Sequence, residues 1–451
     1  MPVNFKKASR FLLFILLSFL FLAFLFIAPV DWTPYQETSY YAQTKQNLDS
    51  VAQVLEQQTQ TDTIKIGWAK TNITPSSPVP LTAYGQRGPY ENVHDSVWVR
   101  TLVFTNQYRT VAFVTYDLWI VHPHLARVIQ DSLMQSGLPL DGIYFSATHT
   151  HNGYGGWSPG LAGQLIAGEY DENVVRLICT KTREAVTTAY NDAEITQLGF
   201  NQYDAAAFVR NRLIENGNTD PWLRVLKMQQ MPSEATALLC TFSAHTTFIS
   251  SREKTLATDY AGPLLQALEQ IDSTDFAAYA AGTVGSHSPV KEGEFTYEKL
   301  YQYAGNLANT TKDGEDSIKT QIELTLKYAK LPVAMRAPHI RIADNWRLRP
   351  WLFEALMGKQ DPYINCLRVG DIVLLGLPCE LSGEFYPSFA QICKERNIHL
   401  IITTFNGNYL GYVTPDEYYS LKKYETRDMN WFGPYNGAYF TELIQGILQV
   451  I

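Results

Sequence analysis

The sequence is poor in charged residues and in cysteine, and these two shortages exclude several classes of protein. Only 18% of the 451 residues are charged, against about 25% in ordinary soluble domains. Because 46% are hydrophobic, an intrinsically disordered chain is excluded. The five cysteines are scattered without a C-x-x-C pair, so neither a disulfide framework nor a thiolate zinc site is indicated. With a net charge of −8 and no long basic run, no nucleic-acid partner is expected.

One long hydrophobic run is present, near the N-terminus. Residues 11–28 contain a single polar residue, Ser18, whereas a bilayer core needs about 20 apolar residues and a signal-peptide core only about 7–15. Basic residues precede the run and acidic residues follow it, which places the N-terminus in the cytoplasm. The sequence thus predicts a cytoplasmic tail (1–10), an uncleaved transmembrane anchor (11–30) and a body on the extracytoplasmic side, periplasmic or extracellular. A cleaved signal peptide is the alternative.

The remainder divides into a short polar segment and a long body. Residues 31–62 are rich in Gln and Thr with few large apolar residues, which predicts a polar stalk. Strand-length apolar runs then occur at residues 101–105, 111–121, 142–146, 372–377 and 400–405. Helical patterns lie at residues 125–134, 173–190, 261–271 and 383–396. Because buried strands alternate with helices and no linker interrupts them, we expect one large mixed α/β (α+β) domain with buried mixed sheets over residues 63–451.

The most informative segment is S-A-T-H-T-H-N-G-Y-G-G at residues 146–156. His149 and His151 are two residues apart, so on an extended backbone both imidazoles point to the same face. The glycines after them leave room for a ligand to approach the backbone. Imidazole is the commonest metal ligand, so the pair is a candidate metal site, although a lone H-x-H is a weak signal.

Two competing motifs are weaker. The pair His122 and His124 flanks Pro123, which is typical of a corner between a strand and a helix. The run G-W-S-P-G at residues 156–160 matches a nucleophile elbow. That motif needs the backbone N–H after the serine, and Pro159 has none, so we reject it.

Two further polar residues end apolar strand-like runs. His245 follows the run from residue 237, and Glu380 follows the run 372–377. An isolated histidine in such a place is more often a satisfied core residue, whereas an unpaired buried glutamate is costly unless it meets a cation or a metal. Taken with the H-x-H pair, they supply the ligand count of a catalytic zinc site.

In these motifs and their order the sequence resembles the neutral (non-lysosomal) ceramidases, from about residue 66 to residue 437. Residues 146–156 nearly reproduce the family's S-A-T-H-T-H-S-G-P-G-G, and residues 408–418 resemble its N-x-Y-x-H-Y-x-T-x-E-E-Y. Supporting matches lie at residues 67–75, 83–85, 94–100, 211–212, 220, 245, 259, 285–289, 377–380, 423–425 and 433–434.

The resemblance implies a zinc amidase site. It implies four zinc ligands, which are His149, His245, Glu380 and Tyr412. It also implies that His151 is an acid/base group, that Arg212 and Tyr424 hold the carbonyl oxygen as it becomes an oxyanion, and that Ser288 is the active-site serine. We favour attack by zinc-bound hydroxide over attack by Ser288, since nothing in the local sequence supplies that serine with a base.

Other residues receive supporting roles. His94, Asp117 and Asp259 are candidates for orienting the zinc ligands, with simple strand-end hydrogen bonding as the alternative for the first two. The tyrosines at positions 409, 418 and 419 are interpreted as packing and rim residues.

The sequence also departs from the family pattern. Ser286 and Val290 replace an aspartate and an asparagine around Ser288, Gly411 replaces the histidine before the tyrosine ligand, and Thr426 replaces a glycine. No counterpart of the family's immunoglobulin-like C-terminal domain is expected in this chain.

These observations lead to one hypothesis and two alternatives. The hypothesis is a membrane-anchored, zinc-dependent amidase that hydrolyses the N-acyl amide bond of a lipid such as ceramide, giving a fatty acid and a sphingoid-type amine. Its partners would be this substrate and the membrane, through the N-terminal helix. The alternatives are a zinc hydrolase of another small amide or peptide, and a non-catalytic protein that binds a lipid or glycan. Oligomeric state stays open.

Overall fold

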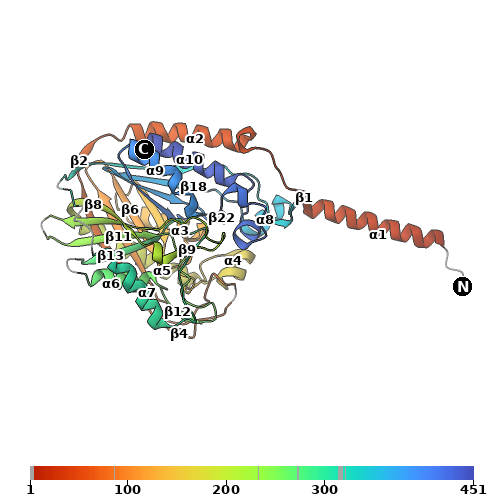
Figure 1. Ribbon diagram of the computed structural model, residues 1–451, viewed down its shortest axis with the longest axis horizontal. Coiled ribbons are helices and arrows are strands. Elements are labelled where there is room, and N and C mark those ends of the chain that lie inside the picture. The colour runs from red at the N-terminus through yellow and green to blue at the C-terminus, as the bar shows by residue number, and fades with distance from the viewer. Residues whose placement is uncertain (1–4, 86, 232, 272–273, 313–317, 320) are drawn as a thin grey trace.

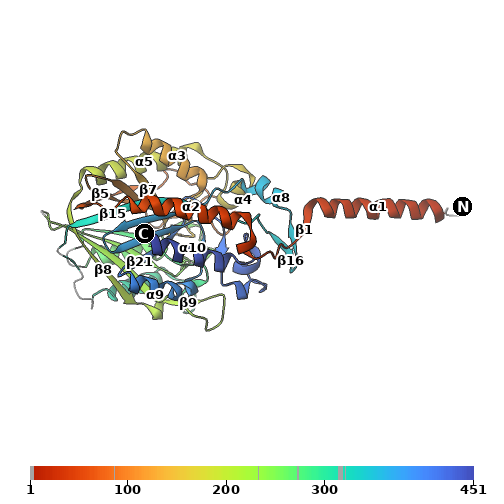
Figure 2. The same ribbon diagram turned by 90° about the horizontal axis from the view of Figure 1, so that it is seen from above.

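The body of the molecule contains two mixed sheets that pack face to face between helices (Figures 1 and 2). The computed structural model describes residues 5–85, 87–231, 233–271, 274–312, 318–319 and 321–451. Alternating apolar strands and amphipathic helices therefore form the mixed α/β body that the sequence predicts, as one large domain.

The first sheet has eight strands. In spatial order they are β13 (Phe276–Ala281), β11 (Thr236–Phe242), β10 (Trp222–Gln230), β8 (Glu194–Asp204), β3 (Lys65–Asn72), β5 (Trp98–Thr105), β6 (Thr110–Tyr116) and β7 (Gly142–Ala147). The β11–β13 and β6–β7 pairs are parallel and the others antiparallel. Strands β3 and β8 share only two residue pairs, so the sheet curls until β7 approaches β13.

The second sheet has five strands and lies on the concave side of the first. In order they are β2 (Thr61–Thr63), β15 (Glu323–Pro332), β18 (Tyr363–Val369), β19 (Ile372–Leu377) and β21 (His399–Thr404), with only β19 and β21 parallel. Apolar side chains of both sheets form one buried cluster, among them Leu102, Phe113, Leu374 and Ile401. Because this cluster is excluded from water on both sides, it stabilises the packing of the two sheets.

Helices cover the two outer faces. On the first sheet lie α3 (Pro123–Met134), α5 (Glu172–Asn191), α6 (Ala261–Glu269) and α7 (Tyr297–Asn309). On the second lie α2 (Ser39–Glu56), α9 (Pro387–Glu395) and α10 (Asn436–Val450). The apolar run 111–121 leaves its strand at Tyr116, and the pattern 383–396 becomes helix α9 only at Pro387.

The expectation of a free polar stalk over residues 31–62 is wrong. Helix α2 packs along β15 and α10 and buries Thr44, Leu48, Val51 and Leu55. These positions recur at helical spacing, so a narrow stripe faces the body. Because the stripe contains only a few apolar residues, the average composition of the segment is polar and does not indicate a packed helix.

The N-terminal apolar run forms helix α1 (Phe5–Phe26), which projects from the body (Figure 1). Within it, residues 9–26 are apolar and long enough to cross a membrane, and none of this stretch is buried. The helix ends earlier than the expected boundary at residue 30, because β1 (Ile27–Pro29) pairs with β17 (Trp346–Leu348). Strand β16 (Arg341–Ala343) completes this small sheet.

Candidate functional site

The predicted site residues lie where several strands end. Ser146 of β7 donates a hydrogen bond to the carbonyl of Thr404 in β21 (3.0 Å), and Thr404 donates to the carbonyl of Ala281 in β13 (3.1 Å). The ends of these three strands therefore meet. Residues that follow them in the chain are brought to one place, although they are far apart in sequence.

Two short strands position the carboxylate and the phenol. Glu380 begins β20 (Glu380–Leu381), which runs parallel to β22 (Tyr412–Val413), with Glu380 directly opposite Tyr412. His245 lies after β11, where its backbone N–H donates to the carbonyl of His287. All three side chains are at most 2% exposed.

The four residues that the resemblance implies as zinc ligands do converge. The ring nitrogens of His149, His151 and His245 lie within 4.8 Å of one another. Oε2 of Glu380 is 2.8 Å from Nε2 of His245 and 3.6 Å from Nε2 of His149. The hydroxyl of Tyr412 is 3.1 Å from the same nitrogen of His245.

The two histidines nearest Glu380 have their tautomers fixed by backbone carbonyls. Nδ1 of His149 is 2.8 Å from the carbonyl of Trp119, and Nδ1 of His245 is 2.9 Å from that of His287. A carbonyl only accepts, so each Nδ1 carries the proton and each Nε2 presents a lone pair. The buried Oε2 of Glu380, which has no hydrogen-bond donor among the described residues, faces the same point. Electron pairs of two imidazoles and a carboxylate that are directed at one point fit a bound metal cation.

Burial keeps these histidines neutral. It lowers the pKa of His149 to about 3, although the nearby carboxylate of Glu380 acts in the opposite direction. It also lowers the pKa of His151 and of His245 well below the ordinary value. A neutral imidazole is the form that binds metal, so the site does not have to lose protons before it can hold one.

The rings of His149 and His151 lie close together, as predicted, but not because the backbone is extended. Strand β7 ends at Ala147, and His149 has a left-handed backbone with φ of 63°. The rings converge through this turn rather than through strand alternation. Stacking on Phe405 (centroids 4.1 Å apart, planes within 12°) holds the ring of His149 in place.

Arg212 lies beside the cluster and is held from both sides. Its Nη2 donates to the hydroxyl of Tyr412 (3.0 Å), and its Nε donates to Oε1 of Glu425 (2.7 Å). Burial opposes the charge of this guanidinium, but the neighbouring phenol and carboxylates outweigh it and raise the pKa of Arg212. The ring of Tyr424 lies 5.7 Å from that of Tyr412 and is half exposed, so this side of the cluster faces solvent.

Ser288 is near the cluster in the fold but does not join it. It lies in β14 (His287–Pro289), which pairs with β9 (Val209–Asn211). Within the described residues its hydroxyl accepts from Nε of Arg210 at 3.3 Å, not from a histidine.

The three residues expected to orient the zinc ligands make their contacts with other groups. His94 stacks on Tyr297 with centroids 3.8 Å apart, and Asp117 pairs with Arg100 at 3.1 Å. Asp259 accepts from the backbone N–H groups of Phe248 and Ile249, which fixes the turn after His245. Carbonyl oxygens, which sequence motifs cannot reveal, orient the imidazoles instead.

Two contributors escaped the sequence prediction. Tyr409, expected to be a packing residue, donates to Oε1 of Glu380 at 2.6 Å, and Glu425 anchors Arg212. Both lie in the tyrosine-rich segments that resemble the family, at residues 408–418 and 423–425. Their closeness in sequence to Tyr412 and Tyr424 is the only feature that could have indicated a role at the site. Of the two weaker motifs, the pair His122 and His124 forms the expected corner before a helix, because His122 caps α3.

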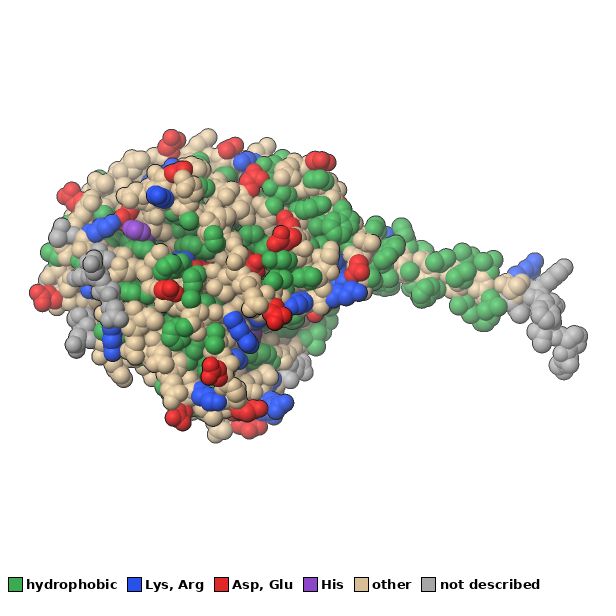
Figure 3. All heavy atoms as spheres, in the orientation of Figure 1, with side chains coloured by type: hydrophobic (Ala, Val, Ile, Leu, Met, Phe, Trp, Pro, Cys, Tyr) green, Lys and Arg blue, Asp and Glu red, His purple; other side chains and the backbone are tan. Residues whose placement is uncertain are grey.

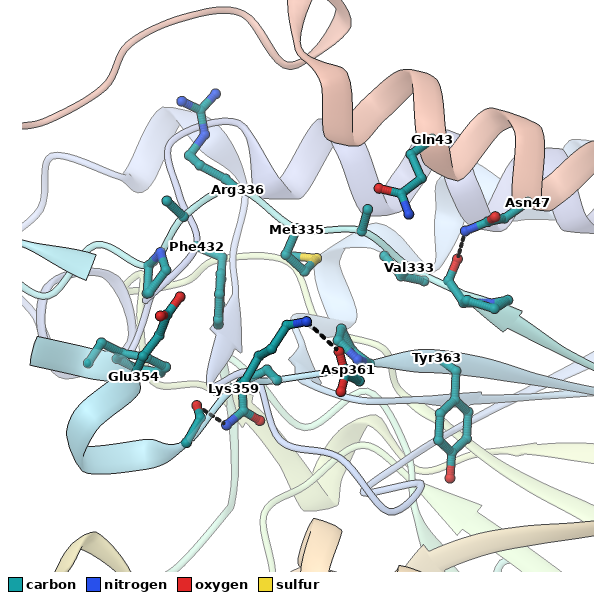
Figure 4. A pocket seen from close by; sticks show the side chains of 18 of the residues that line it. Gln43, Asn47, Val333, Met335, Arg336, Glu354, Lys359, Asp361, Tyr363 and Phe432 are labelled. Carbon is teal, nitrogen blue, oxygen red and sulfur yellow. Dashed lines mark hydrogen bonds and ion pairs between the residues drawn. The ribbon is translucent and has the colours of Figure 1, made fainter. Parts of the chain in front are cut away.

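A groove elsewhere on the body is separate from this cluster (Figure 4). It lies between α2, the end of β15 and the segment 358–363, and Gln43, Arg336, Glu354 and Lys359 are among its lining residues. His149, His151 and His245 are not among the residues that line this groove.

The two-sheet body therefore carries, where several strands end, a group of three histidines that could hold a metal ion. The family model described as neutral/alkaline non-lysosomal ceramidase, N-terminal, matches residues 64–303, more than half of the chain. The chain therefore belongs to the neutral/alkaline non-lysosomal ceramidase family.

Solved structures show the same fold. Neutral ceramidase from Pseudomonas aeruginosa aligns with a TM-score of 0.69 and 18% identity, over 86% of this chain and 75% of that one. A structure described as ceramidase complexed with C2 aligns with a TM-score of 0.69 and 17% identity, over the same shares.

Proposed function

We propose that this chain is a membrane-anchored, zinc-dependent amidase that hydrolyses the N-acyl amide bond of a lipid such as ceramide. The observation that carries the proposal is the set of unprotonated donor atoms directed at one buried point, two Nε2 atoms and Oε2 of Glu380. Family membership supports the substrate class, and helix α1 supports the anchor. Residues 1–10 are assigned to the cytoplasm, and the body to the extracytoplasmic side, periplasmic or extracellular.

The metal-binding part of the proposal rests on four side chains. His149, His245, Glu380 and Tyr412 would hold Zn²⁺, because imidazole and carboxylate oxygen are the donors zinc prefers. When bound, zinc supplies a Lewis acid and a water of lowered pKa.

Proton transfer falls to His151. Its Nε2 lies 3.2 Å from Nε2 of His149, and its buried Nδ1 has no hydrogen-bond partner in the part of the chain that the structure describes. No carbonyl of the described residues fixes its tautomer, which suits a group that takes and returns a proton. We assign it the proton that the departing amine nitrogen requires.

Stabilisation of the oxyanion falls to Arg212 and Tyr424. Glu425 and Tyr412 hold the guanidinium in place, so its charge is already oriented when negative charge develops on the carbonyl oxygen. Tyr424 is half exposed, so its hydroxyl would reach a substrate from the solvent side. We give Ser288 a positioning role, because its neighbour is a guanidinium rather than a base.

The test compares Glu380→Ala with Glu417→Ala, a change at an exposed position of a short 3₁₀ helix. In detergent, the purified wild type should carry one zinc per chain and release fatty acid from N-acylsphingosine in a chelator-sensitive way. Glu380→Ala should lose both properties and Glu417→Ala neither. Zinc binding with cleavage of a different amide only would make the chain a hydrolase of another substrate, and wild-type protein without zinc would overturn the proposal.

A further inference from the structure

The end of helix α1 is held against the body by hydrogen bonds and is not joined to it by a flexible linker. Its last carbonyl groups are capped from the segment that begins α8 (Pro350–Met357). Arg349 donates its backbone N–H to the carbonyl of Phe26 (2.8 Å) and its Nε to that of Phe24 (2.6 Å), and the indole of Trp351 donates to that of Leu25 (3.1 Å). A cationic guanidinium also suits the negative end of the helix dipole.

Ring contacts reinforce this junction. The guanidinium of Arg349 lies 4.6 Å from the ring of Phe24, and the rings of Phe26 and Trp351 are 5.5 Å apart. Pairing of β1 with β17 then begins at the next residue. No flexible segment separates α1 from the body, so the direction of α1 determines which end of the body faces the bilayer.

That end of the body is unusually apolar. Helices α4 (Gly160–Ala167) and α8, which contact each other, and the small sheet of β16 and β17 lie beside the exit of α1 in both ribbon views (Figures 1 and 2). Six of their large apolar side chains are 45–67% exposed: Leu161, Leu165, Ile342, Trp346, Trp351 and Leu356. We call this set the apolar collar. In Figure 3, hydrophobic side chains continue from α1 onto the neighbouring rim of the body.

The pattern of the collar is that of a membrane interface. Leu161 and Leu165 are one helical turn apart and so share a face of α4. Two exposed tryptophans flank the junction, and tryptophan is enriched where protein meets the headgroup region. The acidic residue of α8, Glu354, lies off the collar and lines the groove of Figure 4.

We propose that the apolar collar inserts into the surface of the same bilayer that α1 spans, so that the body rests on the membrane. The proposal rests on the membrane anchor of the proposed function and adds a second contact to it. Continuity with α1 identifies the occupant as lipid, since a helix capped rigidly at its end brings the neighbouring side chains to the interface. Partial insertion removes apolar area from water, which favours the docked state.

Docking here places the catalytic cluster close to lipid. Phe353, the buried residue of α8, packs against Trp431 (5.4 Å between centroids), and Trp431 packs against Tyr409 (5.6 Å). Tyr409 holds Glu380. One helix thus presents exposed side chains outward and contacts the surroundings of the site inward, as an enzyme whose substrate stays in the bilayer requires.

The test uses the full chain in phosphatidylcholine proteoliposomes, with one environment-sensitive fluorophore on an introduced cysteine. Leu165→Cys reports the collar, and Tyr108→Cys is the matched control. Both positions are well exposed, but Gln107 bonds to Asp62 of β2, at the end of the body opposite α1 (Figure 1). Both variants also carry Cys393→Ser, because the other four cysteines are buried.

The expected result is a blue-shifted emission at position 165 that is quenched by phosphatidylcholine carrying a nitroxide on its acyl chain, with neither effect at position 108. Water-like emission at position 165 in protein that floats with the vesicles would overturn docking while leaving the anchor intact. A blue shift without lipid quenching would mean that a second protein copy covers the collar, and would also overturn it. Protein that fails to float would overturn docking and anchor together, whereas ceramide hydrolysis in detergent micelles tests the amidase separately.

Discussion

Tyr409 donates a 2.6 Å hydrogen bond to Oε1 of Glu380, and this bond determines which carboxylate oxygen remains available at the site. With Oε1 engaged, Oε2 alone faces the histidines. The phenol therefore orients a proposed metal ligand without itself being one. Residues that hydrogen-bond to a metal ligand commonly have this orienting role.

Replacing this phenol should weaken metal binding. Tyr409→Phe keeps the ring that packs against Trp119 but frees Oε1, so we expect zinc affinity to fall about 10–100-fold. Competition with a chromophoric chelator measures the change. Tyr418→Phe is the control, because that hydroxyl bonds to Glu384 instead. Equal affinities in the two variants would contradict the orienting role.

A change at Tyr424 should separate catalysis from metal binding. Tyr424→Phe removes one oxyanion donor from a half-exposed side chain, so kcat/KM for N-acylsphingosine should fall by about 10²-fold. Zinc content should remain at one per chain. Tyr301→Phe, a change at another exposed phenol, should leave both quantities unchanged. Full activity in Tyr424→Phe would remove this residue from the mechanism.

Gly411 stands where the family has a histidine, and its backbone explains why. Its φ is 71°, and a Cβ there would collide with the carbonyl of Met429. Gly358 has a similar φ of 76° but open space around it. At φ 76° and ψ 166°, Gly358→Ala should therefore lower the free energy of unfolding only by the conformational cost of about 1–3 kcal/mol, and Gly411→Ala should lower it by more. Urea unfolding in detergent measures both, and equal losses would show that the collision is relieved.

A buried histidine outside the site should make stability depend on pH. Burial, aided by Arg347, lowers the pKa of the fully buried His339 to about 3, against about 6.5 in an unfolded chain. The unfolded state thus binds the proton first. The free energy of unfolding should fall by up to about 1.4 kcal/mol per pH unit as pH drops from 6.5 towards 3.

Substitution of this histidine isolates its share of the effect. His339→Gln can still accept from the backbone N–H of Asp31, as Nε2 now does at 3.2 Å, but does not titrate. Urea unfolding at pH 7 and pH 5 should show a smaller difference for this variant than for the wild type. An unchanged difference would assign the acid sensitivity to other groups.

Much of the fold could be predicted, because buried apolar residues recur along the sequence with the period of a strand or a helix. The apolar runs at β7, β19 and β21 and the helical spacing of α3 and α5 lie within a few residues of the observed elements. Helix α2 was missed as a packed element, because four buried positions among eighteen do not stand out in composition. The early end of α1 was missed because strand pairing with β17 depends on a partner more than 300 residues away.

The sequence by itself determined the kinds of side chain at the site and the motifs that identify the family, since the residues that carry them are contiguous in the chain. Only the tertiary structure decided how these motifs meet. The left-handed turn at His149 is not visible in the H-x-H spacing. The carbonyls that fix two imidazole tautomers and the phenol that holds Glu380 come from segments distant in sequence. The physical reason is that a hydrogen bond depends on the position and direction of both partners, and a linear sequence specifies neither until the chain has folded.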